Sequence, residues 1–196
     1  MTESWSHRLG PAAQTAGMRL LRLYHKATGK SLDLEPLVRL VGMGFFARRF
    51  YGQLIDANGA SYGDVDATFN RIRSLKPQAW AQEWRLTAER FDGIGRAAAA
   101  DGRGATALEL LTKASTYYRF AEMSLLEDTE VRRELQRASV EAYLLAGRFM
   151  DPPLERVCLV VAGHESPAYL RLPKDVHRPP IVLVIPGLGM VKEHGD

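Results

Sequence analysis

Apolar residues recur every three or four positions from about Pro11 to Met150, the spacing of amphipathic helices. Proline, glycine and capping residues divide this stretch into segments, with Asp101-Gly102 as the clearest stop signal. The pattern predicts helices over residues 11–28, 33–58, 65–73, 77–101, 106–125 and 129–149.

The last two predicted helices, Thr106 to Leu125 and Thr129 to Phe149, carry alanines and tyrosines at matching helical positions. Small residues that face aromatic ones allow two antiparallel helices to approach closely. The sequence therefore predicts a tightly packed helix pair. In its alanine and tyrosine placement the pair resembles one tetratricopeptide unit, although no repeat of fixed period is present.

After Asp151-Pro152-Pro153 the apolar period changes from 3.6 to 2, which predicts strands. Leu154 to Ala162 and Ala168 to Leu172 are expected to pair through a turn at residues 163–167. The single cysteine, Cys158, lies in the first of these strands, where we expect a buried and inert thiol. A lone cysteine also excludes an internal disulfide and favours a reducing compartment.

The continuous apolar run Ile181 to Ile185 ends abruptly at Pro186-Gly187, a pattern typical of a strand buried on both faces of a parallel sheet. Parallel partners need crossover segments of about a dozen residues or more, and the sequence stops at Asp196. We therefore expect the front part of a larger α/β protein. An unpaired apolar strand is an aggregation template, so the run should be poorly ordered, packed on the helices or paired with another chain.

The predicted fold class is α+β: a mostly helical region over residues 1–150, then the first strands of a second domain over 151–196. The chain has 26 Lys and Arg against 23 Asp and Glu, scattered rather than concentrated in a stripe. Nucleic-acid binding is therefore not expected. No apolar run approaches the length of a membrane span, and no signal peptide pattern opens the chain. The default expectation is a cytoplasmic protein.

One Gly-x-Ser-x-Gly match places Ser61 where a nucleophilic serine could stand. A nucleophile elbow needs a buried strand before the serine and a helix after it. Here the predicted helix that ends near Asn58 precedes it, so we interpret the match as a helix-to-helix loop without catalytic function. The five histidines lie in separate segments without metal-ligand spacing, so no metal site is predicted.

The turn Gly187-Leu188-Gly189 is a better candidate, because a strand that ends in a glycine turn exposes backbone N–H groups that can hold an oxyanion. An ordinary strand-to-loop turn is the competing interpretation.

The order of these pieces resembles the 2,6-dihydropseudooxynicotine hydrolases and related esterase-like α/β-hydrolases, with the fermentation–respiration switch protein as a more distant relative. The resemblance runs from about Gly59 to Glu193. It rests on short matches that are specific only together: Ser61-Tyr-Gly-Asp-Val65, Trp80 and Trp84, Ala107 through Tyr117-Tyr118 to Ala121, Pro152 to Val157, Tyr169 to Pro173, Gly187-Leu188 and Lys192-Glu193.

The resemblance implies a helical cap over an α/β-hydrolase domain with a Ser-Asp-His triad. Carried over, Leu188 and Gly189 would supply backbone N–H groups to the oxyanion hole, and the triad would lie beyond Asp196. Some relatives have a carboxylate in this turn; Gly189 or Met190 stands there instead, so acid-assisted C–C cleavage is not carried over. The chain alone should be inactive.

Tyr117, Tyr118 and Phe120 could line a pocket for a small-molecule substrate, although aromatic residues at helical spacing more often pack in a core. No cofactor is implied, and a homo-oligomer is left open. The competing hypothesis is a tetratricopeptide-like interaction module without catalysis, which leaves the predicted strands unexplained.

Overall fold

The computed structural model describes residues 35–44 and 60–184. The predicted helix over residues 11–28 lies outside these ranges, as does the turn with Leu188 and Gly189. Of the predicted helix 33–58, residues 35–44 are described, and the single continuous helix is wrong: α2 (Glu35–Val41) ends at Gly42, whose φ of 81° breaks it. Glu35 of α2 accepts hydrogen bonds from the Ser74 hydroxyl and the Leu75 N–H at 2.6 and 2.8 Å, which holds α2 against the segment that contains these two residues.

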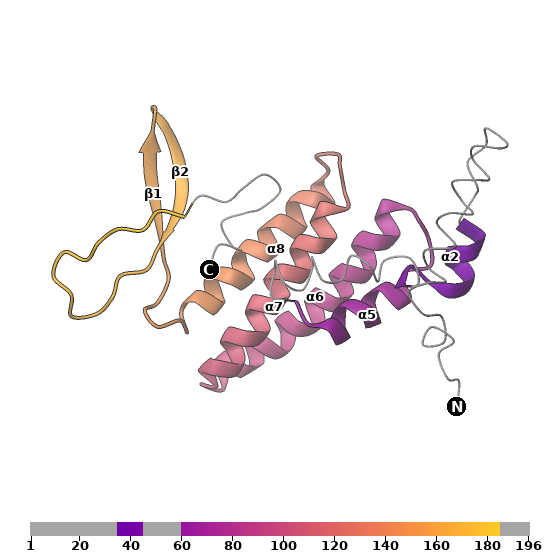
Figure 1. Cartoon of the computed structure of the whole chain (residues 1–196), viewed down its shortest axis with the longest axis horizontal. Helices are drawn as coiled ribbons and strands as arrows, with labels where there is room; N and C mark the ends of the chain where they lie inside the picture. The colour runs from indigo at the N-terminus through magenta and orange to yellow at the C-terminus, as the bar shows by residue number, and fades with distance from the viewer. Residues whose placement is uncertain (1–34, 45–59, 185–196) are drawn as a thin grey trace, which may run out of the picture.

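Most of the described chain is a block of helices that lie side by side (Figure 1). It consists of α5 (Tyr62–Arg71), α6 (Pro77–Ala100), α7 (Gly104–Met123) and α8 (Glu130–Gly147). The boundaries follow from local chemistry. Pro77 stands in the first turn of α6, Gly102 adopts a positive φ of 74° after its end, and the Thr129 side chain accepts the Arg132 N–H at the start of α8. These helices were predicted from the sequence to within a few residues.

The close pairing of α7 with α8 is confirmed, and α6 packs even more extensively along α7. Gly95 of α6 makes that approach possible, because a Cβ atom there would lie only 2.8 Å from the Leu111 side chain. Between α7 and α8 the hydroxyls of Ser115 and Ser139 meet at 3.1 Å in a buried contact. Small residues thus set the spacing of both helix pairs.

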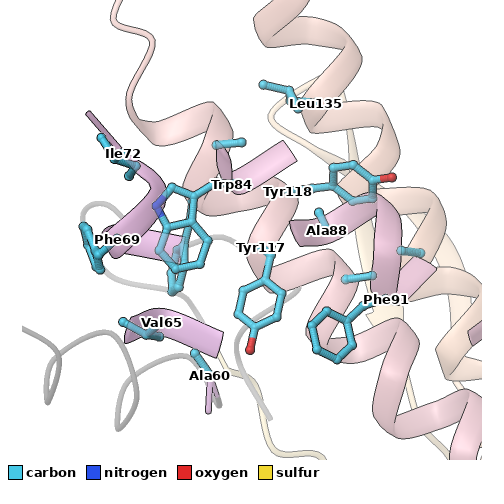
Figure 2. Packing of buried hydrophobic residues seen from close by; sticks show 14 residues of the cluster. Ala60, Val65, Phe69, Ile72, Trp84, Ala88, Phe91, Tyr117, Tyr118 and Leu135 are labelled. Atoms are coloured by element: carbon cyan, nitrogen blue, oxygen red, sulfur yellow. The ribbon is translucent and has the colours of Figure 1, made fainter. Parts of the chain in front are cut away.

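Trp84 lies fully buried at the centre of the core (Figure 2). Its ring centroid is 4.9 Å from that of Phe120, 5.5 Å from that of Phe69 and 5.6 Å from that of Tyr117. Such edge-to-face and tilted contacts add to the free energy gained by burying the rings. The core therefore joins α5, α6 and α7 into one packed unit.

A two-stranded antiparallel hairpin follows the helices, formed by β1 (Glu155–Val161) and β2 (His164–Leu170). The predicted turn at residues 163–167 is wrong: the chain reverses at Ala162-Gly163, where both φ angles are positive (52° and 83°). That geometry suits a two-residue hairpin loop, which matches the twist of the strands. Residues 164–167 therefore belong to β2, and Pro167 lies opposite Cys158.

The expectation of a buried Cys158 is also wrong, because the residue is exposed. In the described residues β1 belongs to a sheet of only two strands, and no further layer covers the face of the hairpin that carries Cys158. Residues 181–184 form neither helix nor strand and are 91% to 62% exposed, so the predicted strand is not formed there and does not pack on the helices. In the part of the chain that the structure describes, β1 and β2 pair only with each other.

Candidate functional site

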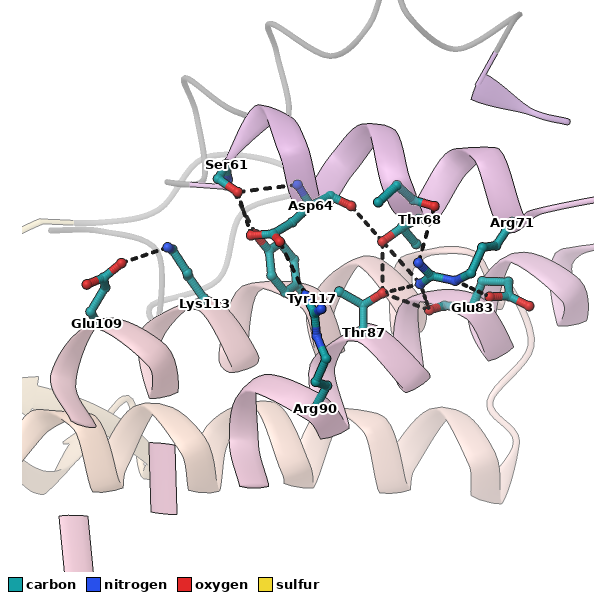
Figure 3. Close-up of polar contacts among 11 residues, drawn as sticks. Ser61, Asp64, Thr68, Arg71, Glu83, Thr87, Arg90, Glu109, Lys113 and Tyr117 are labelled. Atoms are coloured by element: carbon teal, nitrogen blue, oxygen red, sulfur yellow. Dashed lines mark hydrogen bonds and ion pairs between the residues drawn. The ribbon is translucent and has the colours of Figure 1, made fainter. Parts of the chain in front are cut away.

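An extensive polar cluster of the helical block lies where α5 meets α6 and α7 (Figure 3). At its centre is the Asp64 carboxylate. The Ser61 hydroxyl and the Tyr117 hydroxyl both donate to its Oδ2 atom, the second over 2.9 Å, and Arg90 Nη2 lies 3.4 Å from Oδ1. The Tyr117 oxygen in turn accepts the Ser61 N–H at 3.3 Å. One carboxylate thus joins three segments.

Ser61 caps the start of α5 in this cluster. Its backbone has φ −89° and ψ 143°, ordinary extended values, and its Oγ accepts the Asp64 N–H at 3.4 Å. A serine on a nucleophile elbow is held in a strained turn, whereas Ser61 has the relaxed geometry of an N-cap. The predicted loop around Ser61 is corrected from Tyr62 onward, because the helix begins there.

A second part of the cluster continues along α5 and α6. The hydroxyls of Thr68 and Thr87 meet at 2.8 Å, and Arg71 donates to Thr87 Oγ1 at 2.6 Å and to Glu83 Oε2 at 2.9 Å. All of these side chains are engaged with one another, so the arrangement stabilises the helix contact. It has the character of a structural network rather than of a reacting centre.

The three predicted substrate contacts, Tyr117, Tyr118 and Phe120, come together in the core of the helical block. They are 0%, 6% and 3% exposed. Burial is the main cause that raises the pKa of Tyr117 well above its usual range, and the Asp64 carboxylate adds to it. Burial and the Asp92 and Glu89 carboxylates raise the pKa of Tyr118 to about 12. Both hydroxyls are therefore protonated at neutral pH and can donate but not act as bases.

Residues that could hold a metal do not gather in the described ranges, where no group of three or more His, Cys, Asp and Glu side chains has suitable geometry. His164 and His177 are exposed, at the start of β2 and in the link after it. No helix within residues 35–44 and 60–184 is long and apolar enough to cross a lipid bilayer. The other predicted site residues, Leu188 and Gly189, lie outside the described residues.

The comparisons with known proteins point to one enzyme class. The chain is 31% identical over 143 residues to 2,6-dihydropseudooxynicotine hydrolase of Paenarthrobacter nicotinovorans, a match that covers 73% of this chain and 37% of the relative. It is 28% identical over 144 residues to alpha/beta hydrolase pydG of an Acremonium species, covering 70% of this chain and 33% of that protein. No family model matches.

The fold gives the same result. The crystal structure of 2,6-dihydroxy-pseudo-oxynicotine hydrolase superimposes with a TM-score of 0.52 and 30% sequence identity, over 63% of this chain and 34% of that one. The chain spans about a third of the length of the curated relatives it matches. The chain is thus an α/β-hydrolase-like protein. Within that class it is similar to 2,6-dihydropseudooxynicotine hydrolase in both sequence and structure, which confirms the resemblance seen in the sequence.

The sequence pattern missed the polar cluster around Asp64. Its members lie far apart in the chain: Tyr117 follows Asp64 by 53 positions. The only local signal was the Ser-x-x-Asp spacing of Ser61 and Asp64, which is typical of a helix N-terminus.

Proposed function

We propose that this chain forms the N-terminal part of a serine α/β-hydrolase that cleaves an ester, an amide or an activated C–C bond of a small molecule. The observation that carries the proposal is the 31% identity to a named hydrolase over 143 residues, supported by the structural likeness to a hydrolase of the same kind. Both matches cover only about a third of the relative, so activity requires parts that this chain does not match.

In this proposal residues 1–150 form a helical cap and residues 151–196 begin the hydrolase domain. The period of the apolar residues changes at Asp151-Pro152-Pro153, which supports this division. The secondary structure also changes there, because α8 ends at Gly147 and β1 begins at Glu155. A cap over the active site would exclude water and shape the substrate pocket. The triad serine, acid and histidine would follow residue 196.

Leu188 and Gly189 would donate backbone N–H groups to the oxyanion that forms when the serine attacks the carbonyl carbon. Their position after an apolar run that ends in glycine supports this role. Tyr117, Tyr118 and Phe120 remain a prediction as substrate contacts. Because their side chains are buried among the helices, a substrate could reach them only if the aromatic core opened. No cofactor is part of the mechanism.

The proposal is tested with the present chain and with a longer form that continues through the region its relatives have. Hydrolysis of p-nitrophenyl acetate is expected from the longer form only. In that form Leu188→Pro removes the proposed N–H donor and should lower kcat about 10²- to 10³-fold. Leu188→Ala keeps the N–H and serves as the matched control. Hydrolysis by the present chain, or equal kcat in the two variants, would contradict the assignment.

The competing tetratricopeptide-like module is not favoured. It accounts for the α7–α8 pair, but the relatives found by sequence and by structure are hydrolases, and the β1–β2 hairpin has no place in a stack of helix pairs.

A further inference from the structure

The hairpin is fastened to the end of α8 by a compact set of contacts, which we call the joint. It comprises residues 147–154, Tyr169 and Arg171. On the helix side, the Leu154 N–H donates to the Gly147 carbonyl at 2.9 Å, and a Cβ atom on Gly147 would lie only 2.6 Å from the Leu154 side chain. The chain that leaves α8 is thus packed directly back onto the end of the helix.

On the hairpin side, Tyr169 reaches across to α8. Its ring centroid lies 5.4 Å from that of Tyr143, whose side chain is buried in the helical block. Tyr169 stands opposite Arg156 in the ladder, so this contact orients the face of the hairpin that carries both residues. An aromatic contact of this kind is specific in geometry as well as favourable in free energy.

Arg171, the first residue after β2, closes the joint. Its Nε donates to the Pro152 carbonyl at 3.1 Å and its Nη2 to the Asp151 carbonyl at 3.2 Å, so one planar guanidinium binds two successive backbone oxygens. Lys174 adds an ion pair to the Asp151 side chain at 2.9 Å, but both partners are largely exposed and contribute little. The segment after α8 is therefore held by the helix and by the strand that returns.

We propose that the joint fixes the angle between the helical block and the hairpin, with Tyr169 and Arg171 as positioning residues. The functional consequence of the joint rests on the proposed function. If the helices cap a hydrolase domain that begins with the hairpin, the joint determines where the cap lies relative to the active site. Three contacts at different points around the link resist rotation about more than one axis, which a flexible interdomain linker would not.

The exposed Cys158 on β1 gives a direct measurement of the angle, because it is the only cysteine of the chain. A second cysteine, Gln136→Cys, falls on an exposed position of α8. Spin labels on the two report the distance between the hairpin and the helices by pulsed electron paramagnetic resonance. Cys158 stands about 13 Å along the strand from Leu154, so a tilt of about 20° at the joint moves the label by about 4–5 Å.

We expect a single narrow distance distribution in the parent. Arg171→Ala and Tyr169→Ala should broaden it or shift its mean by several ångströms, while Tyr169→Phe, which keeps the ring, should preserve it. The matched control is Arg148→Ala, because Arg148 lies in the joint but its exposed side chain has no partner in the described residues. Lys174→Ala should also leave the distribution unchanged.

Hydrogen exchange of the β1–β2 ladder separates a changed angle from a melted hairpin. A broadened distribution with the ladder still protected supports the proposal. An unchanged distribution in both alanine variants overturns it, and so does broadening that appears only when the ladder is lost. The measurement needs no catalysis: a fixed angle in a longer form that shows no hydrolase activity would retain the joint and remove the proposed function alone.

Discussion

The Tyr117 hydroxyl donates a hydrogen bond of 2.9 Å to the Asp64 carboxylate and so joins α7 to the first turn of α5. The same tyrosine ring packs against Trp84 and Phe91 in the core. One residue therefore belongs both to the aromatic core and to the polar cluster, and its hydroxyl anchors the N-terminus of α5.

Removing that hydroxyl should weaken the helical block. Tyr117→Phe deletes the bond to Asp64 and leaves the Ser61 N–H without its acceptor, and we expect the free energy of unfolding to fall by about 1–2 kcal/mol. Tyr118→Phe is the control, because the Tyr118 hydroxyl makes no hydrogen bond within the described residues; its change should stay below about 0.5 kcal/mol. Urea unfolding gives the free energy of unfolding of both variants, and equal losses in the two would contradict the prediction.

Alkaline pH should destabilise the protein in part through Tyr118. Its pKa is about 12 in the folded state and about 10 for an exposed tyrosine. Below pH 10 both states hold the proton. Between about pH 10 and 12 the unfolded state releases it while the folded state retains it, so stability falls as the pH rises through this window. Tyr118→Phe should show a shallower decline in unfolding midpoint from pH 10 to 12; parallel curves would contradict the assignment.

Local chemistry explains why the helices could be predicted from the sequence. Pro77, Gly102 and Thr129 act within one turn of the positions they define, and the 3.6-residue period continues between them. The hairpin was harder, because Ser166 and Pro167 are typical turn residues but lie in β2. The two-residue turn at Ala162-Gly163 is set by strand pairing, which the local composition did not reveal.

The polar cluster could not be predicted for a related reason. Ser61 and Asp64 are neighbours in the sequence, but Arg90 and Tyr117 reach them only after α6 and α7 fold back across α5. The burial of Tyr117 and Phe120 was the more probable outcome of their helical spacing. In contrast, the exposure of Cys158 depends on how many strands cover β1, a property that no local pattern contains.

Glu122 should be the most sensitive charged residue of the helical block. Its side chain is only 4% exposed and forms ion pairs with Arg119 and, at 2.8 Å, with Arg132. Glu122→Gln leaves two partly buried guanidinium groups without their counter-charge, and we expect a loss of about 2–4 kcal/mol in the free energy of unfolding. Glu130→Gln, in an exposed cluster with Arg133 and Arg137, should cost far less because solvent screens these charges. Chemical denaturation measures the free energy of unfolding of the two variants. Similar losses in both would contradict the prediction.

Two glycines of α6 should respond to alanine in opposite directions. At Gly95 the new Cβ would lie 2.8 Å from Leu111 Cγ and 3.2 Å from its backbone nitrogen, so Gly95→Ala should destabilise by about 1–3 kcal/mol. At Gly93 the new Cβ would meet no atom within 4 Å apart from its neighbours in the same helix, and Gly93→Ala should stabilise the helix by about 0.5–1 kcal/mol. Thermal unfolding of the pair measures both signs; a stabilised Gly95→Ala would show that α6 and α7 can separate without cost.

Ser61 should matter for stability and not for hydrolysis. Ser61→Ala removes the side-chain cap of α5, so we expect a loss of about 1 kcal/mol, whereas Ser61→Asn keeps a capping oxygen and should lose little. In the longer form of the protein, both variants should hydrolyse p-nitrophenyl acetate at the parental rate, because the relaxed N-cap geometry of Ser61 does not suit a nucleophile. Complete loss of hydrolysis in a folded Ser61→Ala variant would make Ser61 the nucleophile and refute its assignment as a cap alone.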